Sequence, residues 1–263
     1  MGWSEDGEED REVGTGPESD FPLDPPTLEE SVPAGERLPA GLYVVGTPIG
    51  NMADITLRAL DTLKGVQAVL TEDTRHTGML LTRYGFRKPL VSCHKFNEAS
   101  RVEAVVTRIL GGQALALVTN AGMPAVSDPG SRLVMGCRKA GCPVTVIPGP
   151  SAATTAIAAS GLGWGGGFLF EGFLPRKSGA RRKRLEILAA GDLPVVLYES
   201  PYRLMALLEE LAEVLGPERL LFVGRELTKK FEETRTGTAA EMIAVYKGRT
   251  IKGELTLVLS PRV

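Results

Sequence analysis

From Leu42 onward the chain alternates short apolar runs with segments whose apolar residues recur at helical spacing, and this alternation restricts the fold more than any other feature. The run LYVVG at 42–46 is typical of a strand, TLRALDTLK at 56–64 of a helix, and VQAVLTE at 66–72 of a second strand. Strands that alternate with helices form βαβ units, which build a mostly parallel sheet covered by helices. We therefore expect an α/β protein.

The alternation continues along the chain. Further helices are expected at 74–83, 100–110 and 131–140, and further strands at 89–92, 114–119 and 144–147. After Pro148 a small-residue helix and the glycine-rich GLGWGGG interrupt the pattern, and a second series of strands and helices follows from 168 to 260. The predicted organisation is an N-terminal α/β domain at 41–153 and a C-terminal α/β domain at 154–263.

Residues 1–40 differ from the rest in composition. They carry twelve acidic and two basic side chains, a formal charge of −10, and are rich in Gly and Pro without apolar periodicity. Such a segment buries too little apolar surface to offset its ordering entropy, so we expect a disordered acidic tail. The remainder carries +8, and a basic globular body is typical of a protein with a polyanionic partner.

Several classes of protein are disfavoured. No run of about 18 apolar residues occurs, and the N-terminus is acidic where a targeting signal is basic and apolar, which predicts a cytoplasmic protein without a membrane partner. The three cysteines form no C-x-x-C pair, and His76 and His94 are isolated, so no metal is expected. The P-loop motif of nucleotide hydrolases does not occur.

Polar and glycine-rich turns follow four of the expected strands. Ligands bind at the carboxyl ends of strands in open α/β sheets, so these turns are the first candidates for a site. They are GTPIGN at 46–51, TEDTRHT at 71–77, NAGMPAVSDPGS at 120–131 and IPGPSA at 147–152. The third is the strongest ligand loop, because its glycines and the N–H groups of the following helix can hold a carboxylate or a ribose hydroxyl.

Three of these turns also have a purely structural interpretation. Asp73 or Thr74 can cap a helix, and Asp128 can belong to an Asp-Pro-Gly helix start. Ser151 more readily caps its helix than acts as a hydrolase nucleophile, because Ala153 replaces the last glycine of G-x-S-x-G.

Nine motifs follow one another in order between Leu42 and Ser260. They are GTPIGN with ADIT and RAL, TEDTRHT, HKFNE, AGMPAVSDPG, PGPSA, EGFLPRK, YESPYRL, RELTKKFEE and KGE. Together they resemble the ribosomal RNA small-subunit methyltransferase I family of the tetrapyrrole methylase superfamily. The resemblance implies a homodimer of the two-domain class III methyltransferase fold. It also implies 2'-O-methylation of a cytidine ribose in the decoding region of 16S rRNA, with S-adenosyl-L-methionine as donor and 16S rRNA or the 30S subunit as partner.

The resemblance further implies a donor pocket in the cleft between the domains. Its expected residues are Pro48, Ala121, Gly122, Met123, Asp128, Pro129, Ser151, Ala152, Tyr198, Arg225 and Lys252. The family usually has Asp-Ala-Gly-Thr-Pro in the third loop, whereas this chain has Asn120 and Met123 in place of the acid and the threonine. The lost carboxylate and hydroxyl are expected to weaken one donor contact or to shift a basic partner.

Methyl transfer to a ribose hydroxyl, a weak acid, needs positioning and a group that accepts the proton or stabilises the alkoxide. The catalytic candidates in the motif segments are Asp73, Glu199, Glu226 and Lys229, with Lys252 as a further possibility. Glu199 and Glu226 can equally be satisfied structural carboxylates. The sequence does not rank these groups.

The segment RKSGARRKR at 176–184 places six basic residues in nine positions, a pattern that suits contact with RNA phosphates. The expected RNA-binding residues are Arg75, His76, Arg176, Lys177, Arg181, Arg182, Lys183 and Arg184. The alternative is a solvated basic helix face. The acidic tail either only adds solubility or competes with RNA for this surface.

Two other classes of function stay open. A tetrapyrrole-modifying methyltransferase would share the fold and donor, but it needs a large apolar cleft, and the basic segment at 176–184 argues against it. A non-catalytic RNA-binding module would not need glycine turns at four strand ends, and it would bind RNA without the methyl donor.

Overall fold

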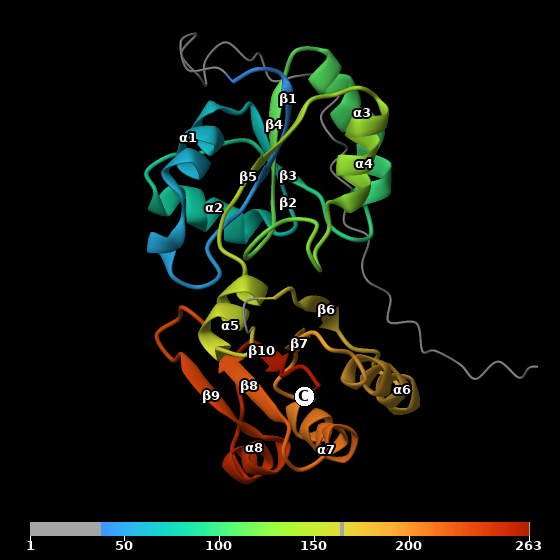
Figure 1. Ribbon diagram of the computed structural model, residues 1–263. Coiled ribbons are helices and arrows are strands. Elements are labelled where there is room, and N and C mark those ends of the chain that lie inside the picture. The colour runs from blue at the N-terminus through green and yellow to red at the C-terminus, as the bar shows by residue number, and fades with distance from the viewer. Residues whose placement is uncertain (1–37, 164–165, 263) are drawn as a thin grey trace, which may run out of the picture.

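The computed structural model describes residues 38–163 and 166–262, which form two α/β domains, one above the other in Figure 1. The expected acidic tail lies outside the described residues as far as residue 37. The two-domain α/β architecture predicted from the sequence is confirmed.

The N-terminal domain alternates strands with helices throughout. Its elements are β1 (Gly41–Val45), the 3-10 helix η1 (Met52–Asp54), α1 (Leu57–Gly65), β2 (Ala68–Thr71), α2 (Thr74–Arg83), β3 (Leu90–Ser92), α3 (Glu98–Leu110), β4 (Ala114–Val118), α4 (Ser131–Lys139) and β5 (Val144–Ile147). The strands form one parallel sheet in the order β3-β2-β4-β1-β5. This arrangement is the parallel winding expected from the alternation.

Helices cover both faces of this sheet, α1 and α2 on one side and α3 and α4 on the other (Figure 1). Successive residues of β1 therefore bury opposite faces, with Leu42 and Val44 toward α3 and α4 and Tyr43 and Val45 toward α1 and α2. The neighbouring strands β1 and β4 are followed by helices on opposite faces, which makes their carboxyl ends a topological switch point. Ligands of open α/β sheets bind at such points.

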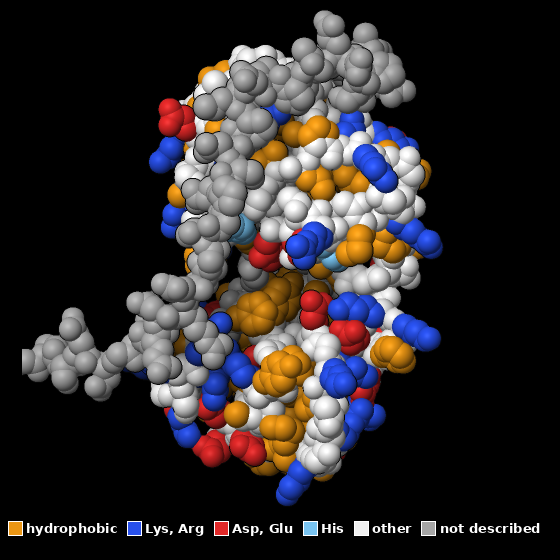
Figure 2. Space-filling model, turned by 180° about the vertical axis from the view of Figure 1, so that it is seen from behind, with side chains coloured by type: hydrophobic (Ala, Val, Ile, Leu, Met, Phe, Trp, Pro, Cys, Tyr) orange, Lys and Arg blue, Asp and Glu red, His pale blue; other side chains and the backbone are white. Residues whose placement is uncertain are grey.

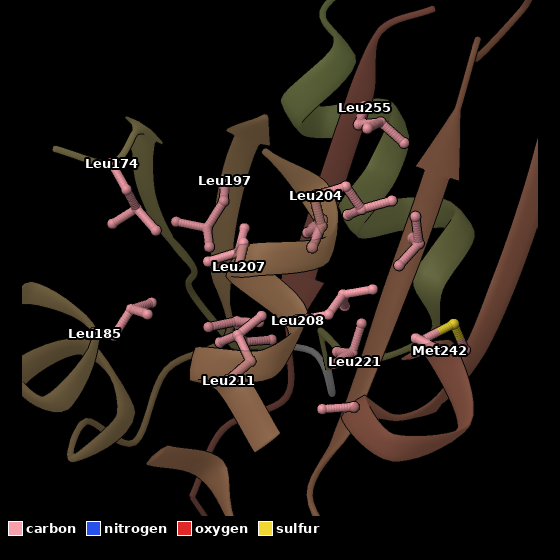
Figure 3. Packing of buried hydrophobic residues seen from close by; sticks show 14 of the residues in the cluster. Leu174, Leu185, Leu197, Leu204, Leu207, Leu208, Leu211, Leu221, Met242 and Leu255 are labelled. Atoms are coloured by element: carbon pink, nitrogen blue, oxygen red, sulfur yellow. The ribbon is translucent and has the colours of Figure 1, made fainter. Parts of the chain in front are cut away.

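The C-terminal domain has a mixed sheet. Its elements are β6 (Leu169–Phe173), α6 (Ser178–Ala189), β7 (Val195–Glu199), α7 (Leu204–Leu215), β8 (Leu220–Arg225), β9 (Glu233–Thr238), α8 (Ala239–Tyr246) and β10 (Leu255–Leu259). The order is β6-β7-β10-β8-β9, and β6 and β7 are the one parallel pair among these strands. Leucines of α6 and α7, together with α8, pack on one face of this sheet (Figure 3).

Helix α5 (Ala152–Ser160) lies between the two domains in Figure 1 and covers the other face of the second sheet. Its Ala153 and Ala156 pack against Val196, Phe222 and Val258. The small side chains let the helix approach the sheet closely. The expected division of the chain between residues 153 and 154 falls inside α5, and it stays a prediction.

The buried carboxylate of Glu98 fixes the end of the loop between β4 and α4. One oxygen, Oε1, accepts hydrogen bonds from the backbone N–H groups of Gly130 at 3.0 Å, Arg132 at 2.7 Å and Leu133 at 3.1 Å. These N–H groups belong to the first turn of α4, where a helix has no backbone partners and its dipole favours a negative charge. Glu98 thereby connects α3 to the third ligand loop.

Replacing Glu98 by alanine is expected to lower the free energy of unfolding by about 3 kcal/mol, because three N–H groups lose their acceptor. Glu98→Gln keeps an acceptor oxygen and should cost about 1 kcal/mol. Urea denaturation measures both, with Glu103→Ala, an exposed glutamate of the same helix, as the control. Equal stabilities for Glu98→Ala and Glu103→Ala would contradict the role given to Glu98.

Candidate active site

A cleft of about 280 Å³ lies where the carboxyl ends of the first sheet face the second domain. It is lined by residues from both domains, namely Ile49, Glu72, Thr119, Asn120, Ala121, Gly122, Met123, Val126, Ser127, Asp128, Ser151, Ala152, Phe173, Tyr198, Glu199, Leu227, Glu254, Leu255 and Thr256. Figure 2 shows the molecule hollowed between the two domains, with hydrophobic side chains inside the hollow.

Three of the glycine-rich turns are held together at the base of the cleft. Thr47 and Gly122 exchange backbone hydrogen bonds of 2.9 and 3.1 Å, which joins the turn after β1 to the loop after β4. Gly122 has φ +83°, a conformation that favours glycine, and a Cβ on Gly46 would lie 2.7 Å from Cα of Gly149 in the turn after β5. The glycines of these motifs therefore serve the close approach of one turn to another.

The turn between β8 and β9 reaches across to the first domain. The backbone N–H of Asn51 donates to Oγ1 of Thr228 at 3.1 Å. Among the described residues, the non-glycine positions with positive φ are Ala125, Ser127, Glu226 and Thr228, at 67°, 62°, 53° and 66°. All four lie in the two loops that border the cleft, and such strained backbone is held in place only where the surroundings fix it, often at functional sites.

The lining of the cleft is acidic. It includes the carboxylates of Glu72, Asp128, Glu199 and Glu254 and contains no Lys, Arg or His side chain within the described residues. One polar atom in the loop after β4, Oδ1 of Asn120, is buried without a hydrogen-bond partner. A buried polar atom of this kind costs stability unless a ligand pairs with it, so the cleft fits a positively charged ligand that also has hydrogen-bonding groups.

Asp128 has the most altered environment of these carboxyl groups. Burial, and next the nearby carboxylate of Glu72, raise its pKa to about 6, and Glu254 adds to the effect. The amide of Asn120 donates to Oε2 of Glu72 at 3.4 Å. An aspartate at position 120 would add another negative charge beside Glu72, whereas the asparagine supplies a neutral donor there.

The four catalytic candidates lie in different environments. Asp73 is exposed at the start of α2, where its Oδ1 accepts from the N–H groups of Arg75 at 2.8 Å and His76 at 3.2 Å. These hydrogen bonds lower the pKa of Asp73. Asp73 therefore has the capping role that the sequence left open, and it does not line the cleft. Glu199 does line it, and its buried carboxylate lies 3.1 Å from Nη2 of Arg203.

The remaining two candidates, Lys229 and Glu226, pair with each other at the edge of the cleft, and Lys229 also pairs with Glu254. Its Nζ lies 2.8 Å from Oε1 of Glu226 and 2.8 Å from Oε2 of Glu254. Burial opposes the charge of Lys229, but its hydrogen bonds to both carboxylates outweigh burial and raise its pKa. Burial likewise opposes ionisation of Glu226, yet the hydrogen bonds from Lys229 and the backbone of Glu254 lower its pKa overall. Lys229 is therefore a fixed cation and Glu226 a weak base.

The structure brings most of the expected donor-binding residues together. Those that line the cleft are Ala121, Gly122, Met123, Asp128, Ser151, Ala152 and Tyr198. Pro48 and Pro129 lie in its turns without lining it, and Arg225 and Lys252 line a neighbouring pocket of about 340 Å³ instead.

Several lining residues are not among those expected from the sequence. Glu254 and Leu255 end or follow the motif KGE, and Phe173 lies in EGFLPRK, so their motifs mark the right segments. Nothing in the sequence distinguishes Thr119 or Thr256 from other strand residues.

Half of the expected basic RNA-binding segment is engaged in ion pairs. Buried Arg181 makes two hydrogen bonds, of 2.6 and 2.7 Å, to Glu210 on α7. Arg184 pairs in the same way with Glu171, and Arg182 pairs with Glu186 and Glu213. The exposed basic residues for which no such pair is seen are Arg176, Lys177 and Lys183 on this segment and Arg75 and His76 on α2.

The fold and the cleft define a class of protein. Residues 41–243 match the family described as Tetrapyrrole (Corrin/Porphyrin) Methylases, and the chain belongs to this family. Its members transfer methyl groups from S-adenosylmethionine. That donor carries a positive sulfonium and an ammonium group, which suits the acidic lining and the unpartnered Oδ1 of Asn120.

Curated relatives place the chain more narrowly within the family. It is 44% identical over 219 residues to a protein of Thermotoga maritima, covering 83% of this chain and 97% of the relative. It is 47% identical to a protein of Mesorhizobium japonicum, over 89% of this chain and 79% of the relative. It is 44% identical to a protein of Escherichia coli O157:H7, over 83% of this chain and 77% of the relative. All three are named ribosomal RNA small subunit methyltransferase I, and the resemblance inferred from the nine motifs is confirmed.

Solved structures confirm the fold. A uroporphyrin-III-C-methyltransferase from Thermus thermophilus superimposes with a TM-score of 0.58 at 24% identity, covering 83% of this chain and 94% of that one. A cobalt precorrin-4 methyltransferase gives a TM-score of 0.61 at 17% identity, covering 87% of this chain and 97% of that one. Within the described residues no helix has the length and apolar character needed to cross a membrane.

The affinity for S-adenosylmethionine is expected to increase roughly fivefold between pH 5 and pH 7, because the ionised form of Asp128 attracts the cationic donor and forms as the pH passes about 6. Isothermal titration calorimetry at several pH values measures this effect. Asp128→Asn, which cannot ionise, should bind the donor more weakly and lose this rise in affinity. The same pH profile in both proteins would contradict the role of Asp128.

Proposed function

We propose that this protein methylates small-subunit ribosomal RNA, and that the acceptor is the 2'-hydroxyl of a cytidine ribose in the decoding region of 16S rRNA. The names of the curated relatives support an rRNA substrate. The observation that carries the proposal is the cleft at the switch point, which has four carboxylates and the unpartnered Oδ1 of Asn120. Exposed basic residues follow two of its lining residues closely in the sequence, Arg75 and His76 after Glu72 and Arg176 and Lys177 after Phe173. The choice of cytidine and of the ribose oxygen rests on the family resemblance, as does the proposed homodimer.

The proposed donor-binding residues are those that line the cleft from the third loop, the IPGPSA turn and β7. When bound, S-adenosylmethionine supplies a methyl group on a sulfonium, which an oxygen nucleophile can attack. Asp128 and Glu72 provide negative charge for the cationic donor, and Tyr198 and Phe173 form one wall with their rings 5.7 Å apart, edge to face.

The environment of each catalytic candidate narrows its role. Lys229 stays protonated at neutral pH and can stabilise a developing alkoxide, but it cannot accept the proton. Glu254 lies 2.8 Å from Lys229, lines the cleft and has a side chain that is 76% exposed, so an acceptor ribose can reach it. We assign Lys229 to alkoxide stabilisation and Glu254 to proton acceptance. Glu199 pairs with Arg203 and Asp73 caps α2, so we assign neither of them a catalytic role.

Exposed aromatic side chains fit an RNA substrate with unstacked bases. Phe173 at the cleft is 59% exposed, and Phe96 and Tyr202, in the turns after β3 and β7, are 93% and 95% exposed. Single-stranded RNA is recognised by stacking of bases on such rings together with phosphate contacts to Lys and Arg. Arg176, Lys177, Lys183, Arg75 and His76 are the proposed basic contacts.

The test is methyl transfer from labelled S-adenosylmethionine to unmodified 30S subunits and to free 16S rRNA, followed by nucleoside analysis. Label is expected in 2'-O-methylcytidine. Asp128→Ala should lower the rate by at least roughly tenfold, and the exposed control Asp61→Ala should leave it unchanged.

Each other outcome has a definite meaning. Label in another nucleoside would remove the cytidine assignment and leave an rRNA methyltransferase. Donor binding without transfer to either RNA would overturn the rRNA proposal and favour a small-molecule acceptor such as a tetrapyrrole. RNA binding without donor binding would favour a non-catalytic RNA-binding module.

A further inference from the structure

A second pocket, of about 340 Å³, lies beside the cleft at the end of β8. Its walls are the start of the β8–β9 turn, the end of α8 and the segment that leads into β10. The lining residues are Arg225, Glu226, Phe231, Tyr246, Arg249, Thr250, Ile251, Lys252 and Gly253. Two of these, Arg225 and Lys252, were expected at the methyl donor.

The pocket carries an excess of positive charge. Arg225 and Arg249 line it and share one carboxylate outside the lining, Glu233, at 3.1 Å each, and Glu233 also pairs with Arg235 at 2.7 Å. Lys252 adds an exposed ammonium group, while its backbone oxygen accepts from Arg225 at 3.3 Å. The one acidic residue of the lining, Glu226, pairs with Lys229. The arrangement favours an anion with several acceptor oxygens.

One residue of the lining has an unpartnered donor. Tyr246 is 1% exposed, and its hydroxyl is buried without a hydrogen-bond partner. Burial raises the pKa of Tyr246, so the hydroxyl stays protonated and available to donate. A buried hydroxyl without a partner costs free energy, and an anion that accepts from it and from the cations would remove that cost.

We propose that this pocket binds a backbone phosphate of the RNA substrate next to the nucleotide whose ribose enters the cleft. The inference rests on the proposed rRNA methylation and adds a subsite to it. Lys252 and Gly253 line the phosphate pocket, and the next residue, Glu254, lines the cleft, so one segment borders both sites. Phe231 is 67% exposed at the pocket and offers a ring for the adjoining base.

The experiment compares Lys252→Ala and Tyr246→Phe with the wild type, with Lys139→Ala, an exposed lysine on α4, as the control. Dissociation constants are measured for a 16S rRNA fragment at several salt concentrations and for S-adenosylmethionine. A third arm records the melting temperature with inorganic phosphate against chloride at equal ionic strength. Because Lys252 is exposed, its replacement tests the proposal even if Tyr246→Phe folds poorly.

Both variants are expected to weaken RNA binding by roughly tenfold and to leave donor affinity within about twofold of wild type. Lys252→Ala should also reduce the slope of log affinity against log salt by about 0.7 to 0.9, the value for one phosphate contact. Loss of donor affinity with RNA binding unchanged would overturn the proposal and return Lys252 to the donor site.

The remaining outcomes separate this proposal from the proposed function. Wild-type RNA binding in both variants, with methylation intact, overturns the phosphate subsite alone. Inorganic phosphate could raise the melting temperature of the wild type but not of the variants, while RNA binding stays the same in all of them. That result would overturn the RNA backbone as the source of the phosphate and identify free phosphate as the ligand. If the wild type neither binds nor methylates rRNA, the proposed function fails, and the phosphate arm alone decides whether the pocket binds an anion.

Discussion

The paired backbone hydrogen bonds between Thr47 and Gly122 hold the turn after β1 against the loop after β4, and the geometry of the cleft depends on them. They bridge the point where the sheet changes its winding direction, so the two loops stay together although their strands are followed by helices on opposite faces. Gly46 and Gly149 let the turn after β5 approach, and Glu98 fixes the far end of the loop after β4. The floor of the site is therefore built from backbone, which positions the acidic side chains above it.

The second domain completes the site with residues of β6, β7, the β8–β9 turn and the start of β10. Thr228 contacts Asn51 across the domain boundary, and the entry to β10 brings Glu254 to the cleft. Lys229 bridges Glu226 and Glu254, which links the wall of the cleft to the neighbouring basic pocket. An acidic cleft and a basic pocket thus lie on either side of a short segment, an arrangement that suits a cationic donor and an anionic substrate.

The parallel sheet and the ligand loop could be predicted because they depend on local patterns. The continuous apolar run of β1 and the glycines at 46 and 122 are visible in the sequence. The ion-pair partners of charged residues are not visible in the sequence, because the two members of a pair can lie far apart along the chain. Arg181 pairs with Glu210, which lies twenty-nine residues away. The number of basic residues at 176–184 therefore overstates the positive charge available to bind RNA.

The same limit applies to Arg225 and Lys252. The motifs place both residues near the cleft, but only the antiparallel pairing of β8 with β10 shows that they face a separate pocket. Strand direction in the second sheet is set by packing across the whole domain, and the runs of apolar residues do not reveal it. The role of Asn120 likewise depends on Glu72, forty-eight residues earlier.

A crystal structure of the protein with S-adenosylhomocysteine, the product that remains after methyl transfer, tests the central claim most directly. The cleft should hold the product between the loop at 119–130 and the segment at 254–256, with Asp128 beside it and Arg225 and Lys252 free of contact. Product bound in the pocket of Arg225 and Lys252, or outside the space between the domains, would contradict the account.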